Sequence, residues 1–306
     1  MPGLVAVTGA TGFIGSNLIP GLIAAGYSVR ALTRRTRTNT TNLEWITGTL
    51  EEIPALEQLV TGADAVIHCA GRVRGASLND FLNTNLTGTI NLLQVLKNST
   101  AMPRFLLVSS LAAREPQLSW YADSKARAER YLIDNAQSMK WTIFRPTAVY
   151  GPGDREMAPL FAATRIGLLP LTGVRSARFG LLYVEDFVEA VICWLKSKDP
   201  AQGIYELDDG TPGGYDHDTV KQIASRVWGR PVFSVPVSGA LIATVAAVNL
   251  RLAQTLGYSP MLTPGKVREL QHTNWVCDTR PLTEAFGWQP QTRLPEGLPR
   301  ALMPVK

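Results

Sequence analysis

The stretch that decides the fold is Leu4–Gly15, which reads LVAVTGATGFIG. Its first four residues are apolar, as in a buried parallel strand. From Phe13 to Ala25 the apolar residues recur at helical spacing, so a helix is predicted directly after the glycine turn. Such a turn presents the unpaired N–H groups of a helix N-terminus, and its glycines let a ligand approach the backbone. We therefore expect a diphosphate-binding turn, the alternative being a glycine-rich turn without a ligand.

The composition is that of a globular protein that can form a full α/β core and a smaller second lobe. The chain has 306 residues, of which 45% are hydrophobic and 18% charged, and its formal net charge is +5. This mild charge, without a long Lys/Arg run, argues against a nucleic-acid partner. Cys69, Cys193 and Cys277 have no paired spacing, so we expect no disulfide framework, no metal site and a cytoplasmic location. Because Met1–Gly3 leads straight into a strand, we expect no signal peptide.

Strand and helix patterns alternate along the first half of the chain. Strands are predicted at 4–7, 27–33, 43–47, 65–71, 104–108 and 141–145, and helices at 13–25, 51–60, 80–98 and from near Trp120. The alternation predicts an α/β protein with a doubly wound parallel Rossmann sheet in residues 1–150. Beyond it, Pro and Gly are frequent and the predicted elements are short: helices at 157–166, 184–196, 218–228 and 281–286, and a strand at 203–207. We expect residues 151–306 to form mainly a smaller substrate-binding lobe, with some segments returning to the sheet.

The end of the second predicted strand determines which nicotinamide cofactor fits. An acidic residue there would hydrogen-bond a ribose 2′-hydroxyl, whereas a basic residue accommodates a 2′-phosphate. The chain has Thr33, Arg34 and Arg35 at this place, with Arg37 close behind and no acid. Because arginine pairs with phosphate by charge and by bidentate geometry, we expect NADP rather than NAD, against the alternative of a solvated basic turn.

A second group of residues gives such a cofactor a reaction. Ser110 follows the strand at 104–108, and the i, i+4 spacing of Tyr121 and Lys125 puts them on one face of the next helix. An ammonium near a phenol favours the phenolate and lowers the tyrosine pKa from about 10 towards neutral pH. We predict that Tyr121 exchanges the proton, that Lys125 lowers its pKa and that Ser110 hydrogen-bonds the substrate oxygen during hydride transfer at a carbonyl carbon.

Other polar residues have two interpretations each. Asn85, near the start of the predicted helix 80–98, is a functional candidate because a polar group that faces a sheet needs a partner. We interpret His68 as a structural residue and Asp186 as a helix-start residue, rather than as catalysts. Arg72 and Arg74 either contact an anion or are solvated.

Taken in order, these motifs resemble those of the extended short-chain dehydrogenases/reductases, a family that also holds sugar-nucleotide epimerases and dehydratases. The matching motifs are TGATGFIG at 8–15, DAVIHCAG at 64–71, NLTGT at 85–89, Ser109-Ser110, Tyr121 with Lys125, Arg145-Pro146 with VYGPG at 149–153, and YVED at 183–186. The resemblance implies the catalytic set Ser110, Tyr121 and Lys125, a nicotinamide near Pro146 and Val149, and a homodimer. The expected cofactor contacts are Gly9, Thr11, Gly12, Phe13, Ile14, Gly15, Thr33, Arg34, Arg35, Thr49, Leu50, Cys69, Ala70, Gly71, Asn85, Val108, Tyr121, Lys125, Pro146 and Val149.

Departures from the family pattern bear on the substrate. Members that act on sugar nucleotides usually carry Asn where this chain has Ala148, and the usual Asp that faces adenine is Thr49 here. The end of the second strand resembles that of NADP-using reductases of the family, and residues 260–278 resemble bacterial reductases of the sphingolipid type, which act on 3-ketosphinganine or oxidised ceramide. We therefore expect an NADP-dependent reductase of a ketone on an apolar, lipid-like substrate. The alternatives are a nucleotide-sugar epimerase or dehydratase, and a non-catalytic NADP-binding protein.

The stretch 233–250 contains no charged residue. Its length is close to that of a membrane span, but Pro236, Gly239 and Asn249 dilute it and Arg251 follows at once. We favour a packed or pocket-lining helix over a helix that faces lipid at a membrane surface, and over a true span. Peripheral membrane contact through residues 233–256 stays an open alternative.

Overall fold

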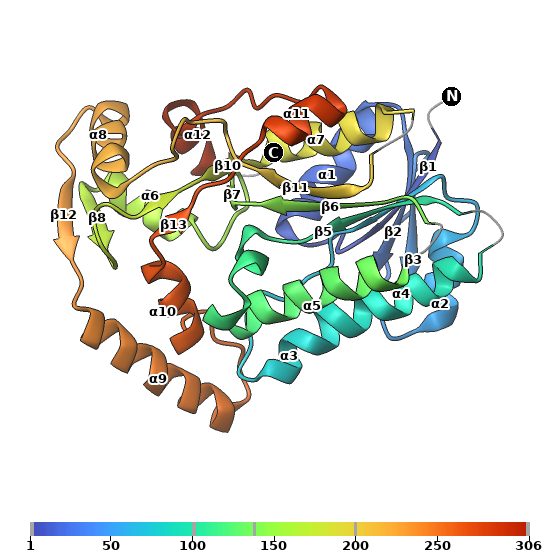
Figure 1. Ribbon diagram of the computed structural model, residues 1–306, viewed down its shortest axis with the longest axis horizontal. Coiled ribbons are helices and arrows are strands. Elements are labelled where there is room, and N and C mark those ends of the chain that lie inside the picture. Colours follow the sequence, from blue (N-terminus) through green and yellow to red (C-terminus); the bar gives the residue numbers. More distant parts are fainter. Residues whose placement is uncertain (1–2, 100–101, 137–138, 199–200, 304–306) are drawn as a thin grey trace.

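The fold is built on a seven-stranded sheet in which all neighbouring strands are parallel (Figure 1). The structure is a computed structural model that describes residues 3–99, 102–136, 139–198 and 201–303. In spatial order the strands are β11 (Gly203–Leu207), β6 (Trp141–Pro146), β5 (Arg104–Val108), β4 (Ala65–His68), β1 (Leu4–Thr8), β2 (Ser28–Thr33) and β3 (Leu43–Thr47). The strand order reverses between β1 and β4, which confirms the predicted doubly wound Rossmann sheet.

Helices cover both faces of this sheet (Figure 1). One face carries α1 (Phe13–Ala24), α7 (Val184–Lys196) and α11 (Arg280–Phe286), and the other carries α2 (Ile53–Val60), α4 (Gly88–Lys97) and α5 (Trp120–Asn135). Each face has its own apolar core. Val5 and Val7 belong to the first core and Ala6 to the second, because successive side chains of a strand point to opposite faces.

The helix predicted at 80–98 is interrupted in the structure. It begins as α3 (Leu78–Leu82), at a capping box formed by Ser77 and Asp80, and passes through the π-helical turn η1 (Asn83–Thr87) into α4. The Asn85 side chain, in that turn, accepts a hydrogen bond from the Arg72 backbone N–H (2.7 Å) and donates one to Ser124 Oγ (2.8 Å). Asn85 therefore ties the loop after β4 to α5.

A second lobe with its own core is built mostly from residues after 147. Three small parallel pairs belong to it: β7 (Ala148–Tyr150) with β10 (Leu181–Tyr183), β8 (Leu168–Leu171) with β12 (Phe233–Pro236), and β9 (Arg178–Phe179) with β13 (Asn274–Trp275). Its helices include α6 (Ala158–Arg165), α8 (His217–Trp228), α10 (Pro264–Gln271) and α12 (Leu294–Ala301), and the short η2 (Leu111–Arg114) and η3 (Pro116–Leu118) face it from the sheet side. These strands are too short to show a periodicity in the sequence, which is why they were not predicted.

Asp186 does not act as a helix cap, although it lies in the first turn of α7 as expected. Its carboxylate accepts hydrogen bonds from the backbone N–H groups of Gln291 (3.1 Å) and Thr292 (2.8 Å). The backbone carbonyl of Asp186 also accepts a bond from Trp288 Nε1 (3.0 Å). Asp186 therefore anchors the C-terminal segment to α7.

The stretch 233–250 is a strand, β12, followed by α9 (Gly239–Leu256). Figure 1 shows α9 at the edge of the molecule, away from the sheet. Within the described ranges it is the helix long and apolar enough to span a membrane, yet only 11% of it is buried. The expectation of a packed or pocket-lining helix holds for one side of α9 only: Ala246 and Ala253 are buried and Leu250 lines a cavity, whereas much of the remaining surface faces solvent.

Candidate active site

A cavity of about 1620 Å³ runs along the carboxyl ends of the sheet strands. Gly9, Cys69, Val108 and Pro146, at or just after the ends of β1, β4, β5 and β6, line one side of it, and α6 and α10 contribute to the other. A single small ligand usually occupies roughly 300–1,000 Å³, so this cavity has room for a cofactor and a substrate together. In a doubly wound sheet, this edge is where ligands bind.

The glycine turn at one end of the cavity fits a diphosphate. Gly9 has φ +70°, and a Cβ there would lie 2.5 Å from the Ala70 backbone nitrogen, so no other residue can occupy it without a shift. A Cβ at Gly15 would lie 2.3 Å from the Gly9 carbonyl oxygen. Helix α1 begins after Gly12 with no side-chain cap and no acidic residue in its first turn. Its first N–H groups and its positive end therefore point to an anion site.

A smaller cavity of about 440 Å³ is lined by Thr11, Thr33, Arg34, Arg35 and Arg37. The Thr33 hydroxyl donates to the Arg35 carbonyl (3.0 Å) and accepts from the Arg35 N–H (3.2 Å), which fixes the start of this turn. The Arg37 guanidinium stacks over Trp45, 4.9 Å from the ring centroid. Arg34 and Arg35 are exposed and form no ion pair with any residue that the structure describes. The turn thus offers unpaired cations beside the glycine turn, as a 2′-phosphate requires.

The three residues expected to be catalytic all line the large cavity. Ser110 caps η2, and Tyr121 and Lys125 lie one turn apart on α5. Lys125 is buried, and its Nζ donates a hydrogen bond to the Val108 carbonyl (2.9 Å). Burial lowers the pKa of Lys125 to about 8, and the charges of Cys69 and Glu129 oppose that shift.

Tyr121 differs from the expectation in its pKa. Burial raises that pKa to about 12, a hydrogen bond with Ser110 opposes the shift, and the negative charge of Glu269 adds to it. The predicted lowering by Lys125 is therefore not seen: burial has the largest effect, and the shift that opposes it comes from Ser110. At neutral pH Tyr121 is a protonated phenol, in hydrogen-bond contact with Ser110 and ready to donate a proton.

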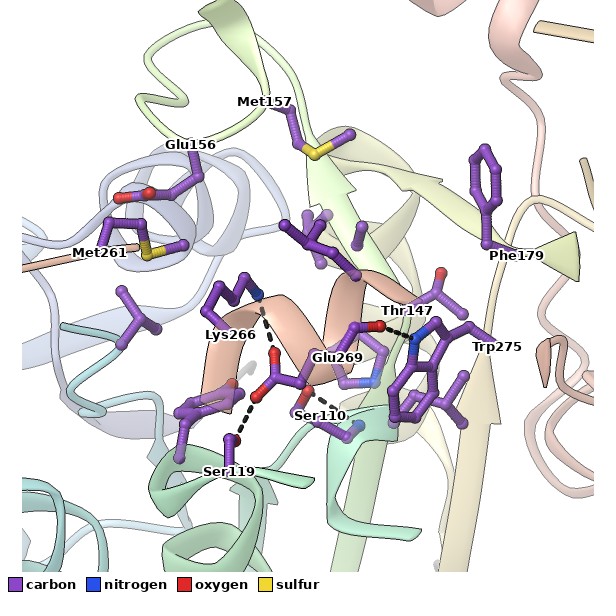
Figure 2. A pocket seen from close by; sticks show the side chains of 18 of the residues that line it. Ser110, Ser119, Thr147, Glu156, Met157, Phe179, Met261, Lys266, Glu269 and Trp275 are labelled. Atoms are coloured by element: carbon purple, nitrogen blue, oxygen red, sulfur yellow. Dashed lines mark hydrogen bonds and ion pairs between the residues drawn. The ribbon is translucent and has the colours of Figure 1, made fainter. Parts of the chain in front are cut away.

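Helix α10 covers this end of α5 through a buried carboxylate that sequence reasoning missed. Glu269 pairs with Lys266 Nζ (2.8 Å), accepts a hydrogen bond from Ser119 Oγ and accepts another at its backbone carbonyl from Trp275 Nε1 (2.9 Å), as Figure 2 shows. Ser119 also caps α5 by accepting from the Ala122 N–H (3.0 Å). The helix that carries Tyr121 is therefore tied to the C-terminal region at its N-cap.

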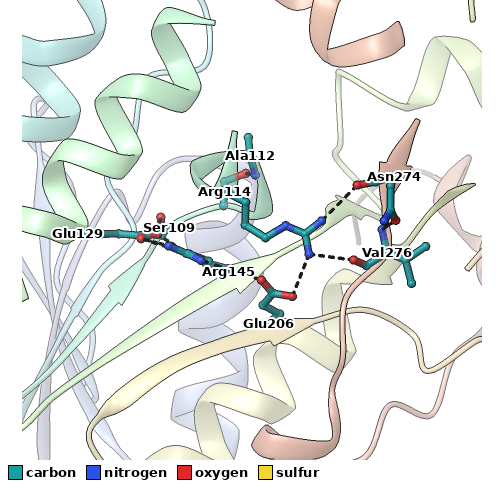
Figure 3. A network of polar contacts seen from close by, with 9 residues as sticks. Ser109, Ala112, Arg114, Glu129, Arg145, Glu206, Asn274 and Val276 are labelled. Atoms are coloured by element: carbon teal, nitrogen blue, oxygen red, sulfur yellow. Dashed lines mark hydrogen bonds and ion pairs between the residues drawn. The ribbon is translucent and has the colours of Figure 1, made fainter. Parts of the chain in front are cut away.

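A polar network that includes Ser109 and Arg114 connects the sheet to the segments around it (Figure 3). Glu129 of α5 pairs with Arg145 of β6 (2.5 Å) and accepts a hydrogen bond from Ser109 Oγ. Glu206 of β11 pairs with Arg114 (3.2 Å), which also donates to the Val276 carbonyl (2.9 Å). The network joins β6, β11, α5, η2 and the C-terminal segment beside the residues predicted to be catalytic, and so holds these elements in place relative to one another.

The remaining wall of the large cavity is mostly apolar. Its apolar side chains come from both lobes and include Val73, Phe81, Leu111, Met157, Leu160, Phe161, Leu169, Leu171, Val174, Phe179, Leu250, Met261, Leu262 and Leu270. Charged residues such as Arg155, Arg178 and Arg268 also reach it, but Arg178 is paired with Asp216 (3.2 Å).

Most of the predicted site residues line one of the two cavities. In the large cavity these are Gly9, Thr11, Gly12, Phe13, Ile14, Gly15, Cys69, Gly71, Val108, Ser110, Tyr121, Lys125, Pro146 and Val149, and in the smaller one Thr11, Thr33, Arg34 and Arg35. Four predicted residues lie outside both walls: Thr49, Leu50, Ala70 and Asn85. The Leu50 carbonyl accepts a hydrogen bond from Asn91 Nδ2 (2.9 Å). The Asn85 side chain forms its hydrogen bonds with Arg72 and Ser124.

His68, at the end of β4, and the two arginines of the following loop, Arg72 and Arg74, all have partners within the protein. His68 is buried between the hydroxyls of Thr8 (2.6 Å) and Thr89 (3.1 Å), and burial lowers its pKa to about 3, so the ring is neutral. Arg72 donates to Ser259 Oγ (2.7 Å), and Arg74 pairs with Glu156 (2.7 Å). His68 is therefore structural, as interpreted, and the two arginines connect this loop to the second lobe.

Known proteins with similar sequences include both reductases and an epimerase. The sequence profile of the NAD dependent epimerase/dehydratase family matches residues 5–207. The ceramide reductase of Caulobacter vibrioides is 34% identical, over 92% of this chain and 88% of that protein. The 2-alkyl-3-oxoalkanoate reductase of Stenotrophomonas maltophilia is 28% identical, over 97% of each chain. The UDP-glucose 4-epimerase of Vibrio cholerae is 25% identical, over 97% of this chain and 94% of that protein.

Solved structures agree with the fold. MoeE5 in complex with UDP-glucuronic acid and NAD matches with a TM-score of 0.75 at 23% identity, over 98% of this chain and 97% of that chain. The UDP-glucuronic acid 4-epimerase from Bacillus cereus, in complex with UDP-glucuronic acid and NAD, matches with a TM-score of 0.76 at 16% identity, over 98% and 97%. At these identities the likeness shows the fold alone. With the profile match and the relative at 34% identity, the chain belongs to the NAD dependent epimerase/dehydratase family, as a nicotinamide-dependent oxidoreductase with the extended short-chain dehydrogenase/reductase fold.

Proposed function

We propose that this chain is an NADPH-dependent reductase of a ketone on an apolar, lipid-like substrate. The observation that carries the proposal is the continuity of one cavity from the glycine turn, past Tyr121, to a largely apolar wall. An apolar wall favours a substrate with long hydrocarbon parts, because each buried methylene contributes about 0.8 kcal/mol. The ceramide reductase and 2-alkyl-3-oxoalkanoate reductase among the relatives support the same substrate class.

In the proposed reaction this chain supplies a proton and positions the ketone. When bound, a nicotinamide cofactor supplies a hydride to the carbonyl carbon. Tyr121 gives its phenolic proton to the carbonyl oxygen, and Ser110 hydrogen-bonds the same oxygen while negative charge grows on it. Lys125, held by the Val108 carbonyl, contributes a positive charge that stabilises the tyrosinate left after proton transfer.

The proposed preference for NADPH rests on the turn after β2. Arg34 and Arg35 lie in the cavity that adjoins the glycine turn, and none of the described residues that line this cavity is acidic. Charge-assisted hydrogen bonds to a 2′-phosphate would therefore favour NADPH, whereas a ribose 2′-hydroxyl would find no carboxylate there.

A nucleotide-sugar epimerase or dehydratase is the second candidate. Arg155, Arg178 and Arg268 reach the cavity wall, and cations of this kind suit a second diphosphate. The 25% identical UDP-glucose 4-epimerase is consistent with this reading. Against it, Ala148 stands in the cavity wall where a family member of that type usually has Asn.

A substrate screen that follows NADPH absorbance separates the two candidates. We expect turnover of a long-chain β-keto amide or β-keto amine with NADPH, slower turnover with NADH, and none with UDP-glucose or UDP-glucuronic acid. Conversion of a UDP-sugar, together with tightly bound NAD in the purified protein and no ketone reduction, would replace the proposal by the second candidate.

A further inference from the structure

The outer face of α9 carries a continuous apolar stripe. It consists of Leu241, Val245, Val248, Leu252 and Leu256, called here the α9 stripe, whose members are 47% to 72% exposed. Successive members are three or four residues apart, so they lie along one side of the helix. Ala246 and Ala253, seven residues apart, form the buried side. A row of large exposed apolar side chains on one helix is rarer on a soluble surface than scattered ones, and it indicates an interaction face.

The charged residues that flank this helix in the sequence are all basic over a long stretch. Between Thr219 and Arg268 the chain has no Asp or Glu, but it has Lys221, Arg226, Arg230, Arg251, Lys266 and Arg268. Arg251 borders the α9 stripe, three residues after Val248. Arg268 is exposed on α10, which packs against α9. An apolar helix face with basic and no acidic neighbours in sequence is complementary to an anionic lipid surface.

The contacts of α9 with the rest of the protein favour a helix that lies on a membrane over one that crosses it. Asn249 Nδ2 donates to the Leu262 carbonyl (2.9 Å) and Gln254 Nε2 to the Ala76 carbonyl (3.0 Å). Tyr258 Oη bonds Asn249 Oδ1 (2.6 Å). Insertion across a bilayer would break these bonds and expose polar groups to hydrocarbon, whereas surface docking keeps them.

The same helix borders the large cavity. Leu250, on the side of α9 away from the stripe, lines it, and so do Met261 and Leu262 just after the helix. One helix therefore has an apolar face towards solvent and an apolar residue towards the proposed ketone site. If α9 rests on a bilayer, a lipid in the leaflet beneath it lies next to the wall of the cavity.

We propose that the α9 stripe docks this protein onto the surface of an anionic lipid bilayer. The docking proposal is supported by the α9 stripe and by the basic residues that flank it, and it does not depend on the proposed function. A second consequence rests on the proposed function: the docked α9 brings the cavity next to the membrane, so that a lipid-like ketone enters without crossing water.

Vesicle binding tests the docking without substrate or cofactor. The full-length protein is floated with vesicles of phosphatidylcholine alone and with vesicles that also contain phosphatidylglycerol. We expect binding to the anionic vesicles, weaker binding to the neutral ones, and a loss of binding at high salt. The double variant Val248→Gln/Leu252→Gln should bind the anionic vesicles about tenfold more weakly or less. Arg251→Glu should weaken the same binding about fivefold or more.

A matched control carries the same chemical change elsewhere. Ile133 and Ile166 are exposed apolar residues on α5 and after α6, so Ile133→Gln/Ile166→Gln should bind vesicles as the parent protein does. Parent protein that stays unbound, or a stripe variant that binds as well as the control, would overturn the proposal. So would a stable dimer in sedimentation equilibrium that Val248→Gln/Leu252→Gln dissociates, since a second copy of the chain would then cover the stripe.

Kinetics separate the docking from the proposed function. With a long-chain ketone embedded in anionic vesicles, the stripe variant should show a higher apparent KM and an unchanged kcat. With a water-soluble short-chain ketone, both constants should equal those of the parent. Vesicle binding without reduction of either ketone would reject the proposed function and leave the docking intact.

Discussion

The two ends of the large cavity are built by different means. At the cofactor end the glycine turn puts backbone in the wall: Gly9 and Gly15 have no room for a side chain, and α1 presents its uncapped start. At the substrate end the wall is made of side chains such as Met157 and Leu160 at the start of α6 and Met261 after α9. The shape of a wall made of backbone cannot be altered by substitution unless the fold itself is disturbed. A wall made of side chains can be altered one residue at a time. The cofactor end therefore fixes the chemistry, and the substrate end can be retuned.

The largest effect is expected where the two ends meet. Tyr121→Phe removes the proton donor and should lower kcat for ketone reduction about 100- to 10,000-fold. Cofactor affinity, followed by fluorescence titration, should stay unchanged because the aromatic ring remains. Tyr131→Phe on the same helix faces the second core and serves as the control, with parental kcat. Full activity of Tyr121→Phe would point to another proton donor.

A pair of glycines tests the rigidity of the cofactor end. Gly9 and Gly62 have nearly the same φ, +70° and +69°, but a Cβ at Gly62 meets nothing within 4 Å. Gly62→Ala should lower the free energy of unfolding by about 1–2 kcal/mol, from backbone strain alone. Gly9→Ala should lose about 1–3 kcal/mol more, since its Cβ collides with the Ala70 backbone. Urea denaturation measures the free energy of unfolding of both variants. If the two variants lost the same free energy, the collision of the new Cβ with the Ala70 backbone would contribute nothing.

The basic turn should determine the choice of cofactor. Arg34→Ala removes charge-assisted bonds worth about 1.5–3 kcal/mol, so KM for NADPH should rise about 10- to 100-fold. KM for NADH should barely change, because it has no 2′-phosphate. Arg127→Ala, at an exposed arginine on α5, is the control. Equal losses for the two cofactors would refute the 2′-phosphate contact.

Lys125 should impose a pH dependence on the reaction. Its pKa lies at about 8 instead of 10.5, so kcat/KM should fall as pH rises through about 8 and the ammonium is lost. Between these two values the unfolded chain binds the extra proton, so the free energy of unfolding should rise with pH. Lys125→Met should lack both trends. A flat profile to pH 10 in the parent would show that the ammonium is not needed.

The smallest effect is expected at the substrate end. Met157→Ala shortens one apolar side chain of the cavity wall and should raise KM for a long-chain ketone about five- to tenfold, with KM for NADPH unchanged. A matched change outside the cavity, Met303→Ala, should leave both constants at their parental values. If Met157→Ala altered NADPH affinity instead, the division of the cavity into two ends would not hold.

The features that the sequence predicted well are local. The glycine turn, the alternation of elements and the Tyr121–Lys125 spacing each lie within one short segment, so periodicity and spacing suffice to find them. Four elements illustrate this: β1, β2, β3 and α7 lie within one or two residues of the predicted bounds.

The features that the sequence did not reveal are contacts between distant segments or properties of one helix face. Glu269 meets Ser119 and the start of α5 only in the folded chain, and no local motif marks it. The composition of 233–250 is apolar whether its side chains face a core, a cavity or solvent, so the sequence favoured a packed or pocket-lining helix and did not reveal the exposed side of α9. The direction of the Tyr121 pKa shift was predicted wrongly, because burial, which the sequence does not give, has the largest effect on that pKa.

The three short parallel pairs of the second lobe have a consequence for the order of folding. β13 pairs with β9, and β12 with β8, although long segments of chain separate the partners. Closing such loops is slow because their entropy is lost before the contacts form. On the ribosome, β1 to β6 are complete long before residues 274–275 emerge. A nascent chain therefore has its dinucleotide edge while the substrate side is still open, and the catalytic chamber closes only near the end of synthesis.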